Sequence, residues 1–296
     1  MADPLIQDLL EKARRPLLSL EFFPPRDEQG FEHLRRAAAD LMAARPDFVT
    51  VTYGAGGSTR TRTLEVCDEL RRIGFGVVMP HLTCAGHGRA ELEAIVDDWH
   101  RRSYRNVMAL RGDPPAGADA FVPPPGGLDH ASDLVGLIRD RHADVCCGVA
   151  GYPELHPESR SAEMDTIHLK RKVMAGAAFV TTQLFYNNAV YAAFVERCRR
   201  AGIYQPILPG LLPAVSLEQV RRIARMCRAG LPGQLEVDLQ DAGGKGPAAE
   251  AVGIRWAASQ IRNLLEGGAP GVHLYILNRS RTALAPELIR CLKPYR

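Results

Sequence analysis

Short apolar runs recur along the chain, and a segment with helical periodicity follows each of them. Eight runs rich in Leu, Val, Ile and Phe predict strands. They cover residues 17–23, 48–53, 76–82, 106–111, 145–152, 179–185, 206–212 and 272–277. Between the runs, apolar residues lie three or four positions apart, as at Phe31, Leu34, Ala38 and Leu41, which predicts amphipathic helices. Strands that alternate with helices form parallel sheets.

Eight such units predict a sheet that closes into a (β/α)8 TIM barrel, and an open doubly wound sheet is the alternative. We expect a single α/β domain over residues 1–296, with a helix before the first strand. Residues 114–127 are rich in Pro, Gly and Ala and follow the fourth strand, so they are a candidate binding loop at the catalytic end. Residues 231–247 are Gly-rich and follow a helix, so we expect a connector there.

Composition and charge limit the classes of function. The formal net charge of +3 is too small to favour nucleic acid as a partner. No apolar stretch is long enough to span a membrane, and residues 1–15 lack the apolar core of a signal peptide. Seven cysteines, an odd number that includes the adjacent Cys146 and Cys147, are expected to be reduced. We therefore expect a cytoplasmic protein that binds neither nucleic acid nor membranes.

Polar side chains collect where the apolar runs end. A barrel brings the carboxyl ends of its strands to one mouth, so this convergence indicates an enzyme. The sharpest candidate is Glu21, which lies between Leu20 and Phe22 inside an apolar strand. An ionised carboxylate is costly there unless it is paired, and apolar surroundings favour the protonated form that a general acid needs. A structural ion pair with an Arg of a neighbouring strand is the alternative.

Other motifs give weaker signals. The tripeptide 111–113 matches an integrin-binding motif, but nothing indicates secretion, and Asp113 has a loop cap as its alternative role. The glycines of residues 54–57 fit neither nucleotide-binding pattern, so a tight turn is the better interpretation. His81 and Cys84 have no second pair with ligand spacing, so we expect no metal. A Gly-x-Ser-x-Gly elbow for hydrolase chemistry is absent from the sequence.

The strand ends resemble, in order, those of the methylenetetrahydrofolate reductase family. The matching segments are residues 19–26, 51–55, 80–84, 110–113, 152–157, 169–173, 183–186, 207–210 and 277–279. They extend from about Leu17 to Arg279, over nearly the whole chain. The family fold is a (β/α)8 barrel, in agreement with the number of predicted strands.

The resemblance implies FAD, bound without a covalent link along the carboxyl ends of the strands. The residues at the family's flavin positions are Thr52, Tyr53, Ala55, His81, Arg111, Gly112, Asp113, Ala131, Tyr152, His156, Asp165, Arg171 and Lys172. Arg171 and Lys172 thereby gain a role beyond a solvated helix face, because a pyrophosphate attracts cations.

The implied reaction is hydride transfer through the flavin between NADH or NADPH and 5,10-methylenetetrahydrofolate, giving 5-methyltetrahydrofolate. By the resemblance, Glu21 would be the general acid for the folate nitrogen, and Asp113 would hydrogen-bond the pterin. Gln183, Gln219 and Arg279 would hold the folate. We also expect a homo-oligomer.

Three positions depart from the family pattern. Ile223 stands where bacterial members carry a Phe that packs on nicotinamide or folate, so the use of the electron donor is in question. His130 and His168 stand where Tyr and Asn are usual, which concerns FAD binding. Two alternatives remain, namely another FAD-dependent barrel oxidoreductase of the proline dehydrogenase kind and a folate- or flavin-binding subunit without turnover. Retention of Glu21 and Asp113 argues against the second.

Overall fold

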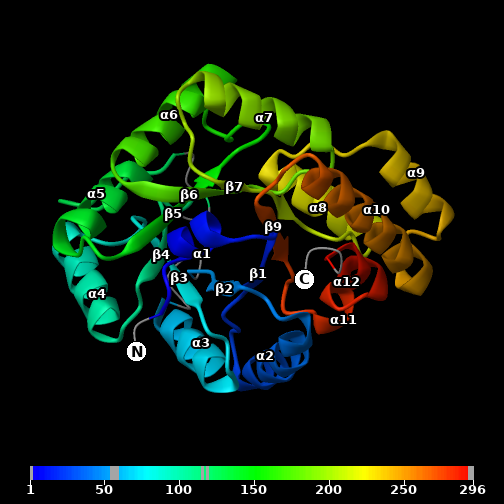
Figure 1. The fold of residues 1–296 in the computed structure, drawn as a ribbon, viewed down its shortest axis with the longest axis horizontal. Coiled ribbons are helices and arrows are strands. Elements are labelled where there is room, and N and C mark those ends of the chain that lie inside the picture. Colours follow the sequence, from blue (N-terminus) through cyan, green and yellow to red (C-terminus); the bar gives the residue numbers. More distant parts are fainter. Residues whose placement is uncertain (1–2, 54–59, 115–116, 118–119, 293–296) are drawn as a thin grey trace.

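The strands of the computed structural model form one parallel sheet that closes into a barrel, and helices surround it (Figure 1). The structure describes residues 3–53, 60–114, 117 and 120–292. The strands are β1 (Leu17–Phe22), β2 (Phe48–Val51), β3 (Val78–Thr83), β4 (Asn106–Leu110), β5 (Cys146–Gly151), β6 (Ala177–Thr182), β7 (Ile207–Leu208), β8 (Gly210–Leu211) and β9 (Gly271–Tyr275). Their order is β7-β6-β5-β4-β3-β2-β1-β9-β8. The predicted (β/α)8 barrel is confirmed.

The seventh predicted strand, residues 206–212, is two short strands, because Pro209 has no N–H for the ladder. On one side of Pro209, β7 pairs with β6, and on the other side β8 pairs with β9, so the split strand closes the barrel. Only glycine fits at position 210, because an added Cβ would lie 2.3 Å from the carbonyl oxygen of Thr182.

The outer layer of the barrel is helical. The helices are α1 (Ile6–Lys12), α2 (Glu28–Leu41), the 3-10 turn η1 (Met42–Ala44), α3 (Arg60–Ile73), α4 (Arg89–Arg101), α5 (Ala131–Arg141), α6 (Ala162–Met174), α7 (Asn188–Arg200), α8 (Leu217–Cys227), α9 (Gly233–Asp241), α10 (Gly246–Glu266), α11 (Ser280–Ala283) and α12 (Pro286–Leu292). Side chains cap several of them; for example, Asp27 accepts a hydrogen bond from the backbone N–H of Gly30 at 2.7 Å. The described part of the 114–127 stretch contains neither helix nor strand, as predicted.

The predicted connector at residues 231–247 was wrong, because α9 lies within it. Leu235 and Leu239, one helical turn apart, are both fully buried in a cluster with α8 and α10. Burial of this narrow apolar face outweighs the glycines, of which Gly233 begins the helix and the others lie beyond its end. Gly243 and Gly244 have φ values of 83° and 70°, a left-handed backbone that ends the helix there.

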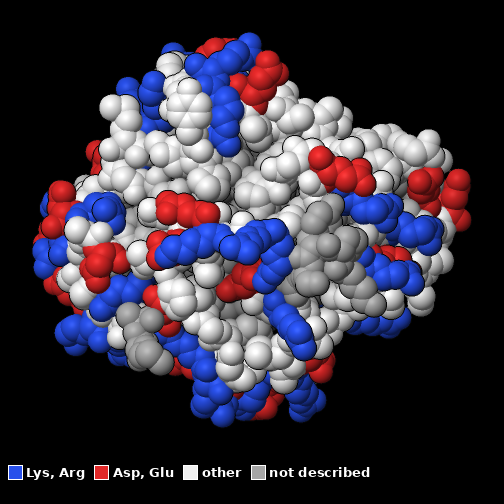
Figure 2. Space-filling model, viewed as in Figure 1, with Lys and Arg blue, Asp and Glu red and all other residues white. Residues whose placement is uncertain are grey.

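Helix α1 closes the barrel at the amino ends of the strands. Ile6 packs with the inward-facing residues Leu17, Phe48 and Cys146. Asn106, at the start of β4, accepts a hydrogen bond from the N–H of Ile6 at 2.7 Å and donates one to the carbonyl of Pro4 at 2.9 Å. Figure 1 shows α1 at the centre of the ring, and Figure 2 shows Lys and Arg side chains across the middle of this closed face. A site that admits a ligand into the barrel therefore lies at the other end.

The structure also bears on membrane association. Within the described residues, no helix combines the length and the apolar character that crossing a lipid bilayer requires.

Replacing Asn106 should loosen this closure. In Asn106→Ala the buried N–H of Ile6 loses its acceptor, and an unsatisfied buried group costs about 1–3 kcal/mol. We expect a lower midpoint of urea unfolding. The matched control is Gln7→Ala, an exposed α1 residue whose side chain bonds only Glu11, and it should change stability by no more than about 0.5 kcal/mol. Equal midpoints for the two variants would show that α1 is not held through Asn106.

Candidate active site at the open end of the barrel

Glu21 lies near the carboxyl end of β1 and points into the barrel, where its side chain is 8% exposed. In the sheet it is level with Thr50 of β2 and Tyr275 of β9. Its Oε2 atom lies 3.3 Å from Nε2 of His273 and 3.6 Å from Nε2 of His81. The partners are thus histidines of β9 and β3. The alternative of an ion pair with an Arg on a neighbouring strand is wrong.

The two histidines differ in their surroundings. Burial lowers the pKa of His81 to about 4, although the nearby Glu21 acts to raise it, so the imidazole is neutral at pH 7. His81 Nε2 is buried and has no hydrogen-bond partner in the described part of the chain. Both ring nitrogens of His273 make contacts. Nε2 faces Oε2 of Glu21, and Nδ1 lies 2.8 Å from Oγ of Ser19.

Sequence reasoning missed Ser19 and His273. Side chains two apart on a strand share a face, so Ser19 faces the interior with Glu21, as His273 does with Tyr275. The alternation of inward and outward side chains along a strand could therefore have identified Ser19 and His273 as residues of the barrel interior. That Ser19 pairs with His273 follows only from the register between β1 and β9, which join distant parts of the chain.

Two predicted flavin positions follow β2. The N–H of Thr52 donates to the carbonyl of Phe22 at 3.0 Å, which continues the ladder past the strand. The hydroxyl of Tyr53 lies 2.9 Å from Nε2 of His87, between β3 and α4. Ala55, a third position in this stretch, lies outside the described residues.

After β4, Arg111 reaches across to the loop that follows β5. Its guanidinium donates to both carboxylate oxygens of Glu158, at 2.7 and 2.5 Å, and this pairing lowers the pKa of Glu158. At Gly112, with φ of 89°, an added Cβ would lie 2.6 Å from the Cβ of Ala85, so the turn needs glycine. Asp113 comes next and is exposed at the rim.

Four predicted positions lie together around β5 and α6. His156 donates its backbone N–H to Asp165 at 2.8 Å, and its ring lies edge-on to Tyr152 with centroids 4.6 Å apart. Lys172 donates from Nζ to the carbonyl of Ala150 at 3.0 Å. Burial lowers the pKa of Lys172 to about 8, against the raising effect of Asp165. Among the described residues, no carboxylate lies within ion-pair distance of this ammonium group.

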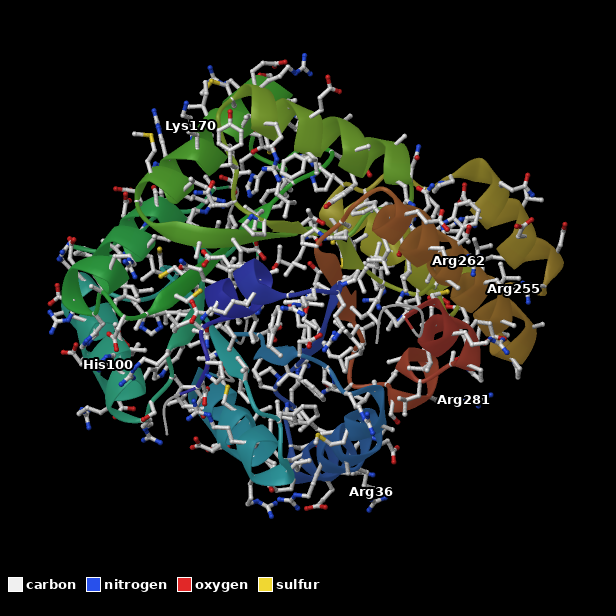
Figure 3. The ribbon with its side chains drawn as sticks, viewed as in Figure 1. Arg36, His100, Lys170, Arg255, Arg262 and Arg281 are labelled. Atoms are coloured by element: carbon white, nitrogen blue, oxygen red, sulfur yellow. The ribbon has the colours of Figure 1, made fainter. Side chains whose placement is uncertain are left out.

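The remaining predicted flavin positions are Arg171 of α6 and Ala131 of α5. Arg171 is exposed, next to Lys172. Lys170 of the same helix points outward at the edge of the molecule in Figure 3, so α6 presents cations to both sides. Ala131, the first residue of α5, is buried. It follows His130, whose ring centroid lies 6.3 Å from that of His168.

The predicted folate residues separate into two places. Gln219 of α8 and Arg279 after β9 line one pocket, together with Tyr275 and Leu277. Gln183 lies at the end of β6, where its side-chain oxygen accepts a hydrogen bond from the N–H of Leu184 at 2.8 Å.

Ile223 is half-buried and packs against the apolar cluster between α8, α9 and α10. Gln219 precedes it by four residues on α8, and both side chains are partly exposed. Phe185 and Tyr186, two aromatic residues that follow β6, are fully buried, at 0% and 2% exposure. Phe185 stacks on Tyr191 of α7, with centroids 5.5 Å apart.

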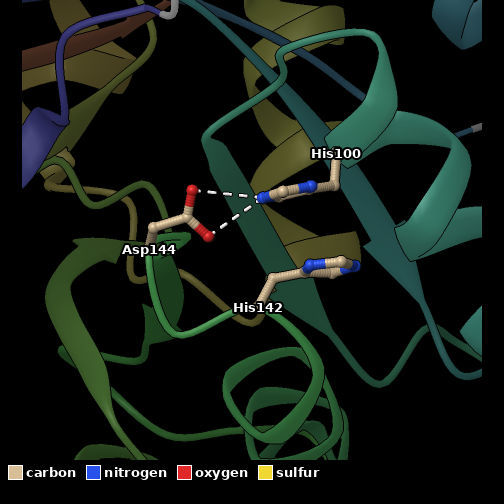
Figure 4. Close-up of side chains that lie close together, drawn as sticks. All are labelled: His100, His142 and Asp144. Atoms are coloured by element: carbon tan, nitrogen blue, oxygen red, sulfur yellow. Dashed lines mark hydrogen bonds and ion pairs between the residues drawn. The ribbon is translucent and has the colours of Figure 1, made fainter.

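Within the described residues, one group has three side chains with metal-ligating atoms close together, namely His100, His142 and Asp144 (Figure 4). It lies on the outer wall, away from the open end. The two rings are stacked at 3.8 Å, so their nitrogen lone pairs do not converge. His100 Nε2 is already paired with Asp144 at 2.9 Å, and His142 Nε2 with Asp97 at 2.8 Å. The geometry is that of a surface ion-pair network.

The earlier pair of His81 and Cys84 belongs to no group of three metal-ligating side chains among the described residues. The thiol of Cys84 lies 3.5 Å from the carbonyl oxygens of Leu110 and His130. Burial raises the pKa of this thiol to about 12.

Fold and site together define a (β/α)8-barrel protein with an enzyme-like polar site at the carboxyl ends of its strands. The chain belongs to the methylenetetrahydrofolate reductase family, whose model matches residues 5–289. It is 36% identical to the 5,10-methylenetetrahydrofolate reductase of Salmonella typhimurium, covering 96% of this chain and 93% of that protein. It is 37% identical to methylenetetrahydrofolate reductase (NADH) 1 of Arabidopsis thaliana, covering 90% of this chain.

The chain spans about half the length of such plant relatives, 47% in the Arabidopsis protein. Among solved structures, it is similar to an uncharacterised protein from Clostridium thermocellum that binds two copies of 5-methyl-5,6,7,8-tetrahydrofolic acid. That match has a TM-score of 0.68 and 16% identity and covers 99% of both chains, so it shows the shared fold.

The environment of His81 predicts how it titrates. The side chain should stay neutral down to about pH 5, because its pKa is about 4 in the folded protein and about 6.5 in an unfolded chain. Between pH 6.5 and pH 4 the unfolded chain binds a proton at this histidine that the folded protein does not bind. The folded state is therefore destabilised as the pH falls through this range, and the destabilisation is absent above it. Imidazole nitrogen shifts measured by NMR give the titration, and an assigned His81 signal with a midpoint above pH 6 would contradict it. His81→Gln should lose less stability between pH 7 and pH 5 than the wild type.

Proposed function

We propose that this protein is a flavin-dependent 5,10-methylenetetrahydrofolate reductase that interconverts 5,10-methylenetetrahydrofolate and 5-methyltetrahydrofolate, with a nicotinamide as electron donor. The observation that carries the proposal is Glu21, a carboxyl group inside the barrel that has two imidazoles and, among the described residues, no arginine or lysine beside it. Membership of the family and the folate bound by the Clostridium protein of the same fold support it.

The residues of the open end fit FAD. Lys172 is a cation without a carboxylate partner in the described chain, which suits a phosphate. His81 Nε2 and Thr181 Oγ1 are buried polar atoms without a partner there, as expected where a ligand completes the hydrogen bonding. When bound, the flavin supplies the hydride transfer between nicotinamide and folate. Arg171 and Lys172 would hold its pyrophosphate, and the other predicted flavin positions would line it.

The protein's own part is to place the folate and to supply a proton. Gln219 and Arg279 share a pocket beside Tyr275, and we assign them with Gln183 to folate binding. Glu21, buried inside the barrel beside His273 and His81, would donate the proton to the folate nitrogen as the general acid. Asp113, exposed at the rim, would accept hydrogen bonds from the pterin.

The assembly is proposed to be a homo-oligomer in the cytoplasm. Met164, Ile167 and Met174 of α6 are 40–77% exposed and form apolar surface that a second copy would cover. All seven cysteines are free, as in a reducing compartment.

The proposed function is tested by measuring the two half-reactions separately, under anaerobic conditions, in the wild type and in Glu21→Gln. Denatured wild type should release FAD, and 5-methyltetrahydrofolate should bleach the flavin absorbance of the native protein. In Glu21→Gln the folate step should slow by at least about 10²-fold, because the amide cannot supply a proton. Flavin reduction by the donor should be largely unchanged.

The outcomes separate the alternatives. A flavin that folate does not bleach would indicate another barrel oxidoreductase, and folate binding without any flavin would indicate a binding subunit. If Glu21→Gln slowed both half-reactions equally, Glu21 would have a structural role instead.

A second test concerns the donor. We expect the wild type to use NADH and NADPH poorly and Ile223→Phe to improve that use. An aromatic side chain at this position would stack on the nicotinamide, and such contacts add about 0.5–1.5 kcal/mol, or roughly threefold to tenfold. Anaerobic flavin reduction by each donor gives the comparison, with Ile223→Leu as the apolar control. Rapid reduction of the wild type, with no gain in Ile223→Phe, would show that Ile223 serves packing alone.

A further inference from the structure

The two carboxylate oxygens of Glu21 have different surroundings. Oε2 faces both imidazoles, at 3.3 Å from His273 and 3.6 Å from His81. Only the contact with His273 is a hydrogen bond. Among the described residues, Oε1 has no hydrogen-bond partner, so it is the oxygen that is free for a ligand.

The Ser19 hydroxyl can donate to Nδ1 of His273 or accept from it, and the two cases correspond to different tautomers of His273. The two nitrogens of a neutral imidazole are one donor and one acceptor. If the hydroxyl of Ser19 donates to Nδ1 across 2.8 Å, the proton of His273 is on Nε2 and is directed at Oε2 of Glu21. The Ser19 hydroxyl is uncharged and stays so when it donates this hydrogen bond. The ring is held further by Tyr275, which lies edge-on at 5.0 Å.

No other described group near Glu21 can take this role. His81 of β3 is too far for a hydrogen bond and is neutral at pH 7, since burial lowers its pKa to about 4. Tyr275 of β9 donates its hydroxyl to the carbonyl of Thr182, and burial and then Glu21 raise its pKa, so it is neutral too. On β2, the level neighbour Thr50 is not ionisable.

We propose that His273, with its tautomer set by Ser19, is a positioning residue that binds Oε2 of Glu21 and leaves Oε1 to carry and deliver the proton. This inference rests on the proposed role of Glu21 as the general acid. The proton leaves Oε1 for the folate nitrogen, and the resulting carboxylate keeps its hydrogen bond from Nε2 of His273. No proton passes through the imidazole of His273 in this step.

The test uses Ser19→Ala and His273→Leu, which remove the tautomer control and the donor. The folate half-reaction should slow by about 10-fold to 100-fold, as for loss of a hydrogen bond to a charged group. Without the donor, the protonated carboxyl group persists to higher pH, so the pH at which the rate falls should move upward. His273→Gln, whose amide can still donate, should recover part of the rate. Flavin content and reduction by the donor should stay within about twofold of the wild type.

The matched control is His142→Leu, which removes a histidine of the outer wall that pairs with Asp97, away from the open end. It should change neither rate nor pH profile. In a Glu21→Gln background, Ser19→Ala should have no further effect on the folate step, because the two act as one unit.

The two proposals fail in different ways. A wild type without a folate half-reaction would overturn the proposed function. A normal wild type, with Ser19→Ala and His273→Leu unchanged in pH profile or slowed equally in both half-reactions, would overturn only the role of His273. If His273→Leu fails to fold, Ser19→Ala and His273→Gln decide the same question.

Discussion

The site depends on a carboxyl group inside the barrel that has no arginine or lysine at its side in the described part of the chain. An arginine next to Glu21 would keep it ionised, since a nearby positive charge favours the carboxylate. The structure instead places His81 and His273 there, and at least His81 is neutral at pH 7. The one hydrogen bond that the described residues give this carboxyl group comes from the imidazole of His273. The closed amino end of the barrel then leaves the open end as its route to a ligand.

Closure of the barrel and construction of the site use the same residues. His273 donates its backbone N–H to the carbonyl of Pro209 at 2.9 Å, where the split strand bridges β6 and β9. The hydroxyl of Tyr275 donates to the carbonyl of Thr182 at 2.7 Å, over a position where only Gly210 fits. A side chain at Gly210 would therefore disturb both the seam of the barrel and the layer that contains Glu21.

A second set of hydrogen bonds fixes the position of the segment that follows β1. Asn278 has a left-handed backbone with φ of 56°, and its amide accepts from the N–H and donates to the carbonyl of Phe23, at 3.0 and 2.8 Å. This pair joins the loops that follow β1 and β9. It gives the Leu-Asn-Arg segment a structural role in addition to the ligand contact that we assign to Arg279.

The alternation of strands and helices and the position of Glu21 were predictable, because both follow from local pattern and from the cost of burying a charge. The pairing of Ser19 with His273 was not, since it depends on which distant strand lies beside β1. The ion pair of Arg111 and Glu158 could not be predicted for the same reason, because it joins two loops that are distant in the sequence. Helix α9 was missed because its two buried leucines were outweighed by nearby glycines in the sequence.

The account is tested most directly by a crystal structure of the protein with FAD and 5-methyltetrahydrofolate bound. It predicts the pterin at the open end of the barrel, with Oε1 of Glu21 within hydrogen-bond distance of the folate and Oε2 still bound by His273. A pterin held elsewhere, or a Glu21 carboxyl group that faces neither ligand, would contradict it.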